Sequence, residues 1–556
     1  MELTWIDLVV FLAFIGLILF VALWASRKED TSEDYFLAGR KLTWWLIGFS
    51  LLASNISTEH FVGMTGKAFG PVGLAVANWE WMSAIAMVLI AWTLLPRFLR
   101  AGIYTMPEFL QYRYSESTRT IMAVYMMVAY VIVLLATVLY SGSIALNTIF
   151  DIPAVFASRF GMSPEKAEFW ATTACIWTIG IAGGIYTVYG GLTAVVWADL
   201  LQGSALLIGG GLVGIYALFK IGMGQGFVAG WHNFVNGPAA SKLHVVLPAN
   251  DTFIPWPAAF LALWIPNIFY WGLNQFITQR ALAAKNVSAG QRGMIFAAFL
   301  KLMIPFLIIM PGIMSYHLYA DKITLSDKAF PYLMNKVLPP QFRGFMFAAL
   351  GGAIMGCFCA GANSASTIFT MDIYRRHINK QASGHRQLVI GRTLTVVFII
   401  VACLWAPIIL HFPGVFAYIQ TLWGFISPAV VAAFLVGMVV KRTPTLAANG
   451  AFILGIPIYG FCRFGGSIWS IPGMANVAPA VRDWVIKFNG LAFLYHQIIV
   501  FVLLVVFMLI VTAIKPLKEP IRIPDSNLID TKVPATNYVI GGLVIAATFV
   551  LYYFFW

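Results

Sequence analysis

The feature that most constrains this chain is a series of long apolar runs, each bounded by charged or turn-forming residues. A helix needs about 20 predominantly apolar residues to cross the hydrocarbon core of a bilayer. The runs therefore predict an all-α polytopic membrane protein with fourteen transmembrane helices. Their predicted ranges are 6–25, 43–69, 74–98, 120–149, 168–189, 193–221, 258–279, 293–320, 341–370, 391–412, 415–440, 445–465, 491–514 and 538–556.

Composition supports the same class of protein. The chain has 556 residues, of which 60% are apolar and only 10% are charged, whereas a soluble domain carries about 25% charged residues. This leaves too little polar surface for a soluble enzyme, a disordered chain or a disulfide-stapled secreted domain. The five cysteines lie in apolar runs without metal-like spacing, so neither a disulfide framework nor a zinc site is expected.

Loop charges indicate the orientation of the chain. The formal net charge is +13, and the Lys and Arg residues are scattered over short loops. This pattern is typical of positive charge retained on the cytoplasmic side, so no nucleic-acid partner is expected. Loops after odd-numbered segments hold about twice as many Lys and Arg as the opposite loops, which predicts that both termini are external. We expect a multi-pass protein of the plasma (cell inner) membrane.

Several ionisable residues lie inside the apolar runs. Glu59 and His60 lie in the second run, Glu80 in the third, Asp199 in the sixth and Lys301 in the eighth. A charge at this depth costs several kcal/mol unless it has a partner or faces a wet cavity. A structural Glu80–Lys301 ion pair would explain two of them. Because the groups lie on separate segments, they favour a polar cavity through the bundle.

Two of the runs contain predicted interruptions. The second run is broken near Ser54-Asn55, and the seventh, five segments later, near Pro266-Asn267. Broken helices at corresponding positions of two five-helix blocks are typical of inverted-repeat transporters, whose binding site lies at the breaks. The alternative is a pair of packing kinks, which are common in membrane helices. The spacing favours a five-plus-five inverted repeat with two broken helices.

This interpretation divides the chain into five regions. The first transmembrane helix and a basic cytoplasmic loop precede the first repeat, and an external loop separates the two repeats. Three peripheral helices follow the second repeat. In chain order the five regions are 1–42, 43–221, 222–257, 258–440 and 441–556.

Seven segments, in the same order along the chain, carry a family resemblance. They resemble the sodium/solute symporter family in its sugar-carrying branch, which includes the sodium/glucose cotransporters and their bacterial homologues. The resemblance extends over nearly the whole chain, and fourteen helices also fit this family. The seven segments are NISTEHFVGM (55–64), WEWMS (79–83), GIYTMPEF (102–109), YGGLTAVVWAD (189–199), NIFYWGLNQ (267–275), NSASTIFTMDIY (363–374) and YIQ (418–420).

The resemblance implies a sugar pocket. A neutral polyol needs hydrogen-bond donors and acceptors in fixed directions, and the matched side chains supply both. A lone membrane histidine is more often a packing residue, but the match assigns His60 to a substrate hydroxyl. The implied inner gate is Tyr270, with Trp271 beside it. The implied substrate-binding residues are Asn55, His60, Glu80, Ser83, Asn267, Lys301 and Gln420.

The sodium site that the resemblance implies is incomplete here. The carbonyls of Ala53, Ile56 and Ala353 would still face the ion, but Gly356 and Cys357 replace the two hydroxyl ligands. A thiol is a poor ligand for a hard cation that prefers oxygen. Three alternatives stay open, and in each of them the chain needs no other cofactor. Sodium binds weakly, protons replace it, or transport is uncoupled.

Asp199 is the candidate group for proton coupling. A buried carboxylate can titrate near neutral pH when its surroundings disfavour the charged form. The alternative is a structural, hydrogen-bonded carboxylate near the inner membrane face. The residues around position 199 do not distinguish these two roles.

The predicted function is that of a secondary active transporter for a sugar or polyol, working by alternating access, rather than that of an enzyme. A channel would need a continuous polar pore, and an intramembrane enzyme would need a nucleophile and a base at suitable spacing. The ionisable groups instead gather at mid-depth beside the breaks. The expected partners are a small-molecule substrate and the lipid bilayer. The sequence distinguishes neither the sugar nor the oligomeric state.

Overall fold

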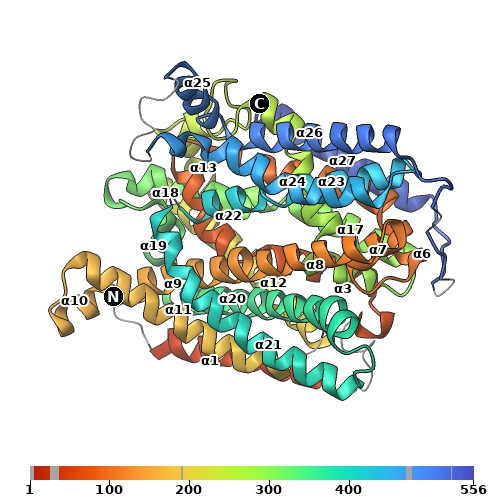
Figure 1. Ribbon diagram of the computed structural model, residues 1–556. Coiled ribbons are helices and arrows are strands. Elements are labelled where there is room, and N and C mark those ends of the chain that lie inside the picture. Colours follow the sequence, from red (N-terminus) through yellow and green to blue (C-terminus); the bar gives the residue numbers. More distant parts are fainter. Residues whose placement is uncertain are drawn as a thin grey trace.

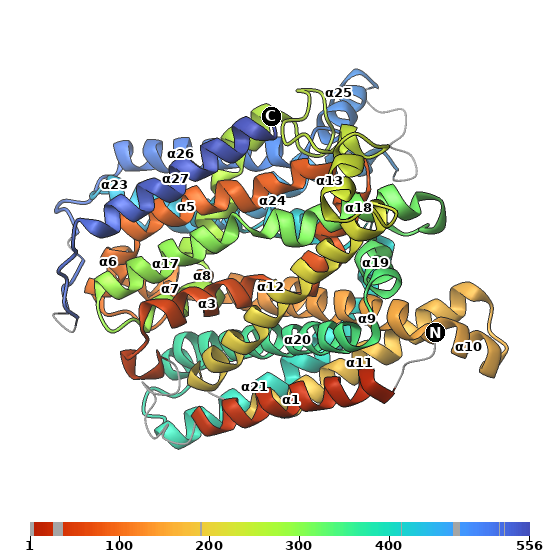
Figure 2. The same cartoon turned by 180° about the vertical axis from the view of Figure 1, so that it is seen from behind.

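A computed structural model describes residues 5–25, 37–189, 192–412, 414–470, 479–521, 523–526 and 529–556. Over these residues the chain is helical, and extended pairing is limited to two isolated bridges, Leu42 with Ala284 and Leu247 with Pro255. The long helices lie side by side with roughly common direction in one bundle (Figures 1 and 2). The prediction of an all-α fold is confirmed.

The α-helices have the following bounds. In chain order they are α1 (Trp5–Ala25), α3 (Trp44–Asn55), α4 (Thr65–Phe69), α5 (Asn78–Thr93), α6 (Leu95–Ala101), α7 (Met106–Arg113), α8 (Glu116–Ala129), α9 (Ala136–Phe150), α10 (Ile152–Phe160), α11 (Pro164–Tyr189), α12 (Leu192–Ile221), α13 (Phe227–Val235), α14 (Trp256–Ala262), α15 (Trp264–Ile268), α16 (Gln275–Leu282), α17 (Val287–Lys301), α18 (Met310–Tyr319), α19 (Ala329–Val337), α20 (Pro340–Ile368), α21 (Gly384–Trp405), α22 (Val415–Trp423), α23 (Ser427–Val439), α24 (Thr445–Phe464), α25 (Pro479–Asn489), α26 (Phe493–Ile514) and α27 (Thr536–Phe554). Turns of π-helix join several of them, at η2 (His60–Met64), η4 (Tyr130–Leu135), η6 (Phe269–Leu273), η7 (Pro305–Ile309) and η10 (Phe369–Ile378).

Ten helical stretches in the described part of the chain are long and apolar enough to cross a membrane. Helices also cover the other predicted ranges, including α1, α11 and the two interrupted segments. The number of fourteen crossings stays a prediction. The ten stretches are Gly73–Thr93, Glu116–Thr148, Val195–Ile221, Val287–Lys322, Pro340–Ile378, Gly384–His411, Val415–Val439, Thr445–Ser470, Phe493–Ile514 and Thr536–Phe554.

The first break lies where the sequence predicts it. Helix α3 ends at Asn55, and Ile56 has extended backbone angles (φ −78°, ψ 102°). The chain becomes helical again through the π-helical turn η2 and continues as α4. Backbone groups freed by such a break can be tolerated in a membrane protein only where the segment is enclosed by other helices.

The second break lies further along the chain than predicted. Pro266 and Asn267 are inside α15, preceded by a kink at Leu263. Pro266 fits there because the first turn of a helix does not use its backbone N–H groups. The backbone becomes extended only at Asn274 (φ −91°, ψ 116°), whose side chain accepts a hydrogen bond from the backbone N–H of Phe276 and caps α16.

Small residues let the central helices approach the first broken helix closely. A Cβ on Gly203 of α12 would lie 2.8 Å from Cβ of Ala53. On the other side, a Cβ on Gly293 of α17 would lie 2.9 Å from the carbonyl oxygen of Trp44. Close packing through glycine is typical of membrane helices. It places α3 between α12 and α17, in the middle of the bundle.

The outer helices include those at both ends of the chain. Helices α1 and α21 lie along one edge of the bundle, and α26 and α27 lie along the opposite edge (Figures 1 and 2). Helix α27 packs on α5 and α17, and α26 packs on α23 and α24. The residues at the two breaks, Asn55, Ile56 and Asn274, are buried inside the bundle.

Candidate functional site

A cavity lies beside the two breaks. Segments α3, η2, α5, α15, η6, α17 and α22 contribute to its wall. All the predicted substrate and gate residues line it, although they come from distant parts of the chain. They are Asn55, His60, Glu80, Ser83, Asn267, Tyr270, Trp271, Lys301 and Gln420.

Local backbone structure turns these side chains toward one place. Asn55 is the last residue of α3, and His60 is the first residue of η2, so the extended backbone at Ile56 separates them. Glu80 and Ser83 lie three residues apart on α5 and so share one face of that helix. The break and the helix thus present four polar side chains to the same cavity.

Glu80 and Lys301 form an ion pair at the centre of the site. Lys301 Nζ contacts Glu80 Oε2 and donates a 2.5 Å hydrogen bond to Asn55 Oδ1. Asn55 Nδ2 in turn donates to the Tyr270 hydroxyl at 3.3 Å. The ion pair that the sequence suggested is present, and both of its members also line the cavity. Pairing reduces the cost of burying the two charges without removing their capacity to bind hydroxyls.

Aromatic rings complete the wall. Tyr270 and Trp271 meet edge to face at 5.3 Å, and Lys301 Nζ lies 5.1 Å from the centre of the Trp271 ring. At another part of the wall, Trp79 and Phe416 meet edge to face at 5.1 Å. Flat apolar rings of this kind can stack against the apolar face of a small ring-shaped ligand.

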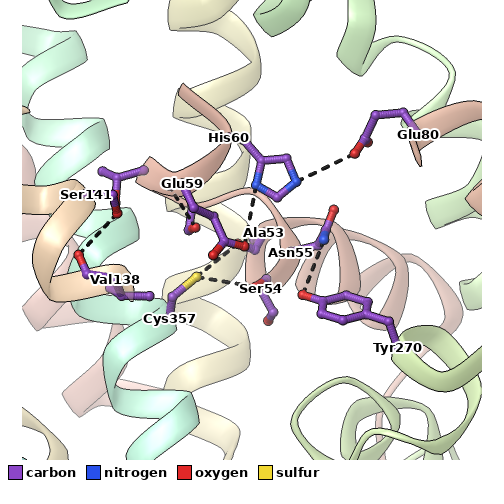
Figure 3. A network of polar contacts seen from close by, with 12 residues as sticks. Ala53, Ser54, Asn55, Glu59, His60, Glu80, Val138, Ser141, Tyr270 and Cys357 are labelled. Carbon is purple, nitrogen blue, oxygen red and sulfur yellow. Dashed lines mark hydrogen bonds and ion pairs between the residues drawn. The ribbon is translucent and has the colours of Figure 1, made fainter. Parts of the chain in front are cut away.

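At the position expected to bind sodium, the thiol of Cys357 contacts backbone carbonyl oxygens. Cys357 Sγ lies 3.3 Å from the carbonyl oxygen of Ser54 and 4.0 Å from that of Ala53 (Figure 3). The Cys357 thiol donates to these carbonyls where a hydroxyl ligand would otherwise face the ion. At Gly356, an added Cβ would collide with Gln202 Oε1, so Gln202 fills the space of the second hydroxyl. The residues present do not reproduce the oxygen ligands expected for sodium.

Asp199 is buried and strongly hydrogen-bonded. Its Oδ2 accepts hydrogen bonds from the hydroxyls of Ser50 (2.6 Å) and Ser54 (3.0 Å) and pairs with Arg280 at 3.1 Å. Arg280 also donates to the carbonyl oxygen of Phe276 at 2.5 Å. This geometry matches the structural alternative for Asp199, because a positive charge already balances its carboxylate.

Glu59 is a cavity residue to which the sequence interpretation gave no binding role. His60 lies between two carboxylates, with Nδ1 3.8 Å from Glu59 Oε1 and Nε2 3.6 Å from Glu80 Oε1 (Figure 3). Glu59 was visible as an ionisable residue inside an apolar run. Only the folded chain shows that its carboxylate faces the imidazole rather than a lysine or arginine.

Sequence reasoning also missed the roles of Arg280 and Gln202, because these roles depend on contacts that form only in the folded chain. Arg280 is a charged residue near the end of the seventh run, and Gln202 is an ordinary polar residue in the sixth. Their importance depends on contacts with Asp199 and with the space above Gly356. A charged residue in an apolar run was an available signal for Arg280, whereas nothing in the sequence distinguishes Gln202.

Comparison with solved structures identifies the class of fold. The chain superimposes on a Na⁺-coupled sialic acid symporter in a substrate-bound outward-open state with a TM-score of 0.72. The match covers 94% of this chain and 100% of that one, at 21% identity. The chain therefore shares the fold of that protein.

Sequence comparison gives the family. The model of the sodium:solute symporter family matches residues 35–457. A sodium/glucose cotransporter of Vibrio parahaemolyticus is 38% identical over 485 residues, covering 83% of this chain and 86% of that protein. Sodium/myo-inositol cotransporter 2 of Mus musculus is 32% identical, covering 81% and 68%. This chain belongs to the sodium:solute symporter family, which confirms the resemblance, and these relatives are cotransporters rather than enzymes.

Proposed function

We propose that this protein takes up a sugar or sugar-like polyol across the plasma membrane by alternating access. The observation that supports this most directly is the meeting of seven predicted substrate residues in one cavity beside two helix breaks. The proposal includes fourteen crossings and two inverted five-helix repeats, 43–221 and 258–440, which move against each other around the cavity.

The cavity has the hydrogen-bonding capacity that a polyol requires. Glu80 accepts hydrogen bonds, Lys301 donates them, and the Gln420 amide does both. Asn267 Nδ2 and His60 Nδ1 are buried and have no hydrogen-bond partner among the described residues. A buried polar atom without a partner is unfavourable. A substrate hydroxyl that bonds to one of these atoms would therefore contribute more binding free energy than a hydrogen bond at an exposed site.

Release toward the cytoplasm would require Tyr270 to move. Its hydroxyl accepts a hydrogen bond from Asn55, so this one contact joins the first break to the π-helical turn before the second. We assign Tyr270 and Trp271 to the inner gate. Opening would separate Asn55 from Tyr270 and expose the cavity to the inner side.

The coupling ion is the part of the proposal in which this chain differs from the family pattern. Sodium bound by the carbonyls of Ala53, Ile56 and Ala353 would lack two hydroxyl ligands, because Gly356 and Cys357 replace them. We propose that sodium binds weakly at this position. Asp199 is balanced by Arg280, and we assign it a structural role rather than proton transfer.

Uptake into proteoliposomes tests the proposed function. The names of the relatives make glucose and myo-inositol the first probes, followed by other sugars, amino sugars and inositols. Glu80→Gln and Gln420→Ala should each lower uptake by more than about tenfold, a loss of at least about 1.4 kcal/mol in binding. Glu168→Gln is the matched control, since Glu168 is 37% exposed and pairs with Lys328 away from the cavity.

The same vesicles distinguish a transporter from the other classes. Saturable uptake and counterflow of chemically unchanged substrate are expected. If transport continued at the wild-type rate in both Glu80→Gln and Gln420→Ala, the assignment of the pocket would be wrong. Non-saturable flux would indicate a channel, and a chemically altered product would indicate an enzyme.

A further inference from the structure

Glu59 places a carboxylate at the first helix break. Its side chain is 16% exposed and lines the cavity. Within the described ranges, no lysine or arginine lies within ion-pair distance of its oxygens, and His60 Nδ1 lies 3.8 Å from Oε1. A charge in this position is unfavourable unless a proton or another cation compensates it.

The imidazole of His60 is placed to share that proton. The His60 side chain is buried, and its two nitrogens face Glu59 and Glu80 from opposite sides of the ring. Nδ1 has no hydrogen-bond partner in the described part of the chain. At 3.8 Å the contact is too long for a hydrogen bond but close enough for a strong electrostatic interaction, because both side chains are largely removed from water.

The other charged groups near the break are already paired. On α5 and α17, Glu80 and Lys301 balance each other. On α12 and α16, Asp199 and Arg280 balance each other beside Ser50 of α3. The remaining titratable neighbours are the Tyr270 hydroxyl on η6 and the Cys357 thiol on α20, which are neutral in their protonated forms. One added proton therefore makes the whole group of side chains electrically neutral.

We propose that Glu59 and His60 form a proton-binding pair and that this proton is the ion coupled to transport. The inference rests on the proposed function of substrate uptake. The pair holds one proton, either on the carboxylate or on the imidazole, and releases it as a free proton without any change of covalent structure. While the cavity is closed, the proton neutralises a charge that is largely excluded from water. When water enters from the inner side, the charged form is solvated and the proton leaves.

His60 connects the proton to the substrate. The same imidazole lines the cavity and lies 3.6 Å from Glu80, a proposed substrate ligand. With the proton on the imidazole, His60 can donate from both nitrogens, whereas the neutral ring donates from only one. A substrate hydroxyl that accepts from His60 is therefore held more tightly when the pair is protonated. This preference links the two binding events.

The test is substrate accumulation in sodium-free proteoliposomes, with the membrane potential clamped and the outside more acidic than the inside. Wild-type protein should accumulate the substrate above equilibrium, and a pH dye trapped in the vesicles should report acidification that requires the substrate. Glu59→Gln should lose accumulation and acidification. Its remaining counterflow should no longer depend on pH. Glu168→Gln, a carboxyl-to-amide change outside the cavity, should behave as wild type.

Binding provides a second measurement that does not need transport. In wild-type protein, substrate affinity measured by thermal shift should fall with rising pH, by up to about tenfold per pH unit, because one proton is linked. In Glu59→Gln this pH dependence should be absent. If Glu59→Gln bound substrate with the wild-type pH dependence, the proposal of a proton-binding pair would be overturned, even if the variant had lost transport for another reason.

The outcomes separate this inference from the proposed function. Counterflow in the wild type without any response to a pH gradient would overturn the proton pair and leave the transport function intact. Full proton-driven accumulation by Glu59→Gln would also overturn it. If no sugar or polyol exchanged in the wild type at any pH, the proposed function itself would fail.

Discussion

The thiol of Cys357 determines what the expected sodium position can bind. A serine in its place would offer an oxygen to the ion, whereas the thiol is a soft and weak ligand. Cys357 instead contacts the carbonyl oxygen of Ser54 at 3.3 Å. Gln202 fills the neighbouring space above Gly356. Restoring the two hydroxyls therefore requires two substitutions, at positions 356 and 357, and also space above position 356, which Gln202 now fills.

Combining Gly356→Ser and Cys357→Ser with Gln202→Ala should make transport depend on sodium. The hydroxyls add two oxygen ligands, and the shorter side chain at position 202 removes the collision. We expect the dissociation constant for sodium to fall by at least about tenfold relative to the weak wild-type position, or about 1.4 kcal/mol. Gly356→Ser alone should lower thermal stability by less than the about 1–3 kcal/mol of a rigid overpacked core, because the atom it meets, Gln202 Oε1, ends a flexible side chain that can move. Uptake assays across a sodium series measure the first effect.

Gln202→Ala alone is the matched control, since it makes room without adding ligands. It should leave sodium dependence as in the wild type. Unchanged sodium dependence in a folded triple variant would show that the missing hydroxyls are not what limits sodium binding.

At the scale of elements, the Asp199–Arg280 pair joins three segments of the bundle. Asp199 lies on α12, Arg280 on α16, and the hydroxyls of Ser50 and Ser54 on α3. Each partner is buried, so removing one of them would leave a charge without compensation. The pair therefore fixes the helix that follows the second break against the helix that precedes the first.

Asp327 connects the segment between two spans to the helix that carries Gln420. It lies in the turn η9 (Ser326–Lys328), between the stretches that end at Lys322 and begin at Pro340. Its side chain is buried, and Oδ2 accepts a hydrogen bond from the backbone N–H of Val415 at 3.4 Å. Burial raises the pKa of Asp327 from 3.8 to about 6, although the Val415 N–H and Lys67 oppose the rise.

Asp327→Asn should therefore stabilise the protein at neutral pH. Because the folded-state pKa is the higher one, the protonated carboxyl favours folding, and stability falls as pH rises from about 4 to about 6. The loss is about 3 kcal/mol and persists above that range. The amide oxygen can still accept from Val415. Melting in detergent should show a higher Tm for the variant at pH 7.5 and equal Tm values near pH 4. If the difference in Tm between Asp327→Asn and the wild type were the same at pH 7.5 and near pH 4, the raised pKa of Asp327 would be contradicted.

The positions of helices followed from the sequence more readily than their irregularities. Long apolar runs predict where helices lie, because a bilayer requires length and apolarity. The break at Ser54-Asn55 was predicted from polar residues in mid-run. The one at Asn274 was not, because Pro266 drew attention to a position where a helix tolerates proline. Turns of π-helix such as η2 and η6 have no comparable signal in the sequence.

At the scale of the molecule, the candidate site shows which information the sequence motifs provide and which depends on contacts between distant segments. The family resemblance supplied the cavity residues, including Glu80, Lys301 and Gln420, because motifs preserve their order along the chain. Roles that depend on contacts between segments were not predicted. Three of these roles are the placement of Glu59 against His60, the charge balance of Asp199 and the packing of Gln202 above Gly356, and each is visible only in the folded bundle.

Fourteen crossings and the distribution of loop charges predict the orientation of the whole molecule. All five cysteines are buried, so native labelling should be low and single introduced cysteines can report on each loop. Glu165 and Gln381 are exposed positions on opposite predicted sides, after the fourth and the ninth segments. In intact cells, a membrane-impermeant maleimide should label Glu165→Cys, whereas Gln381→Cys should react only after lysis.

Tags at the two ends complete this measurement, because an even number of crossings places both ends on the same side. Both tags should be accessible to antibody on intact cells. Labelling of Gln381→Cys before lysis, with Glu165→Cys protected, would mean that the molecule is inverted. One accessible tag and one protected tag would require an odd number of crossings. In that case one of the segments outside the ten long apolar stretches, such as α1 or α11, would not span the membrane.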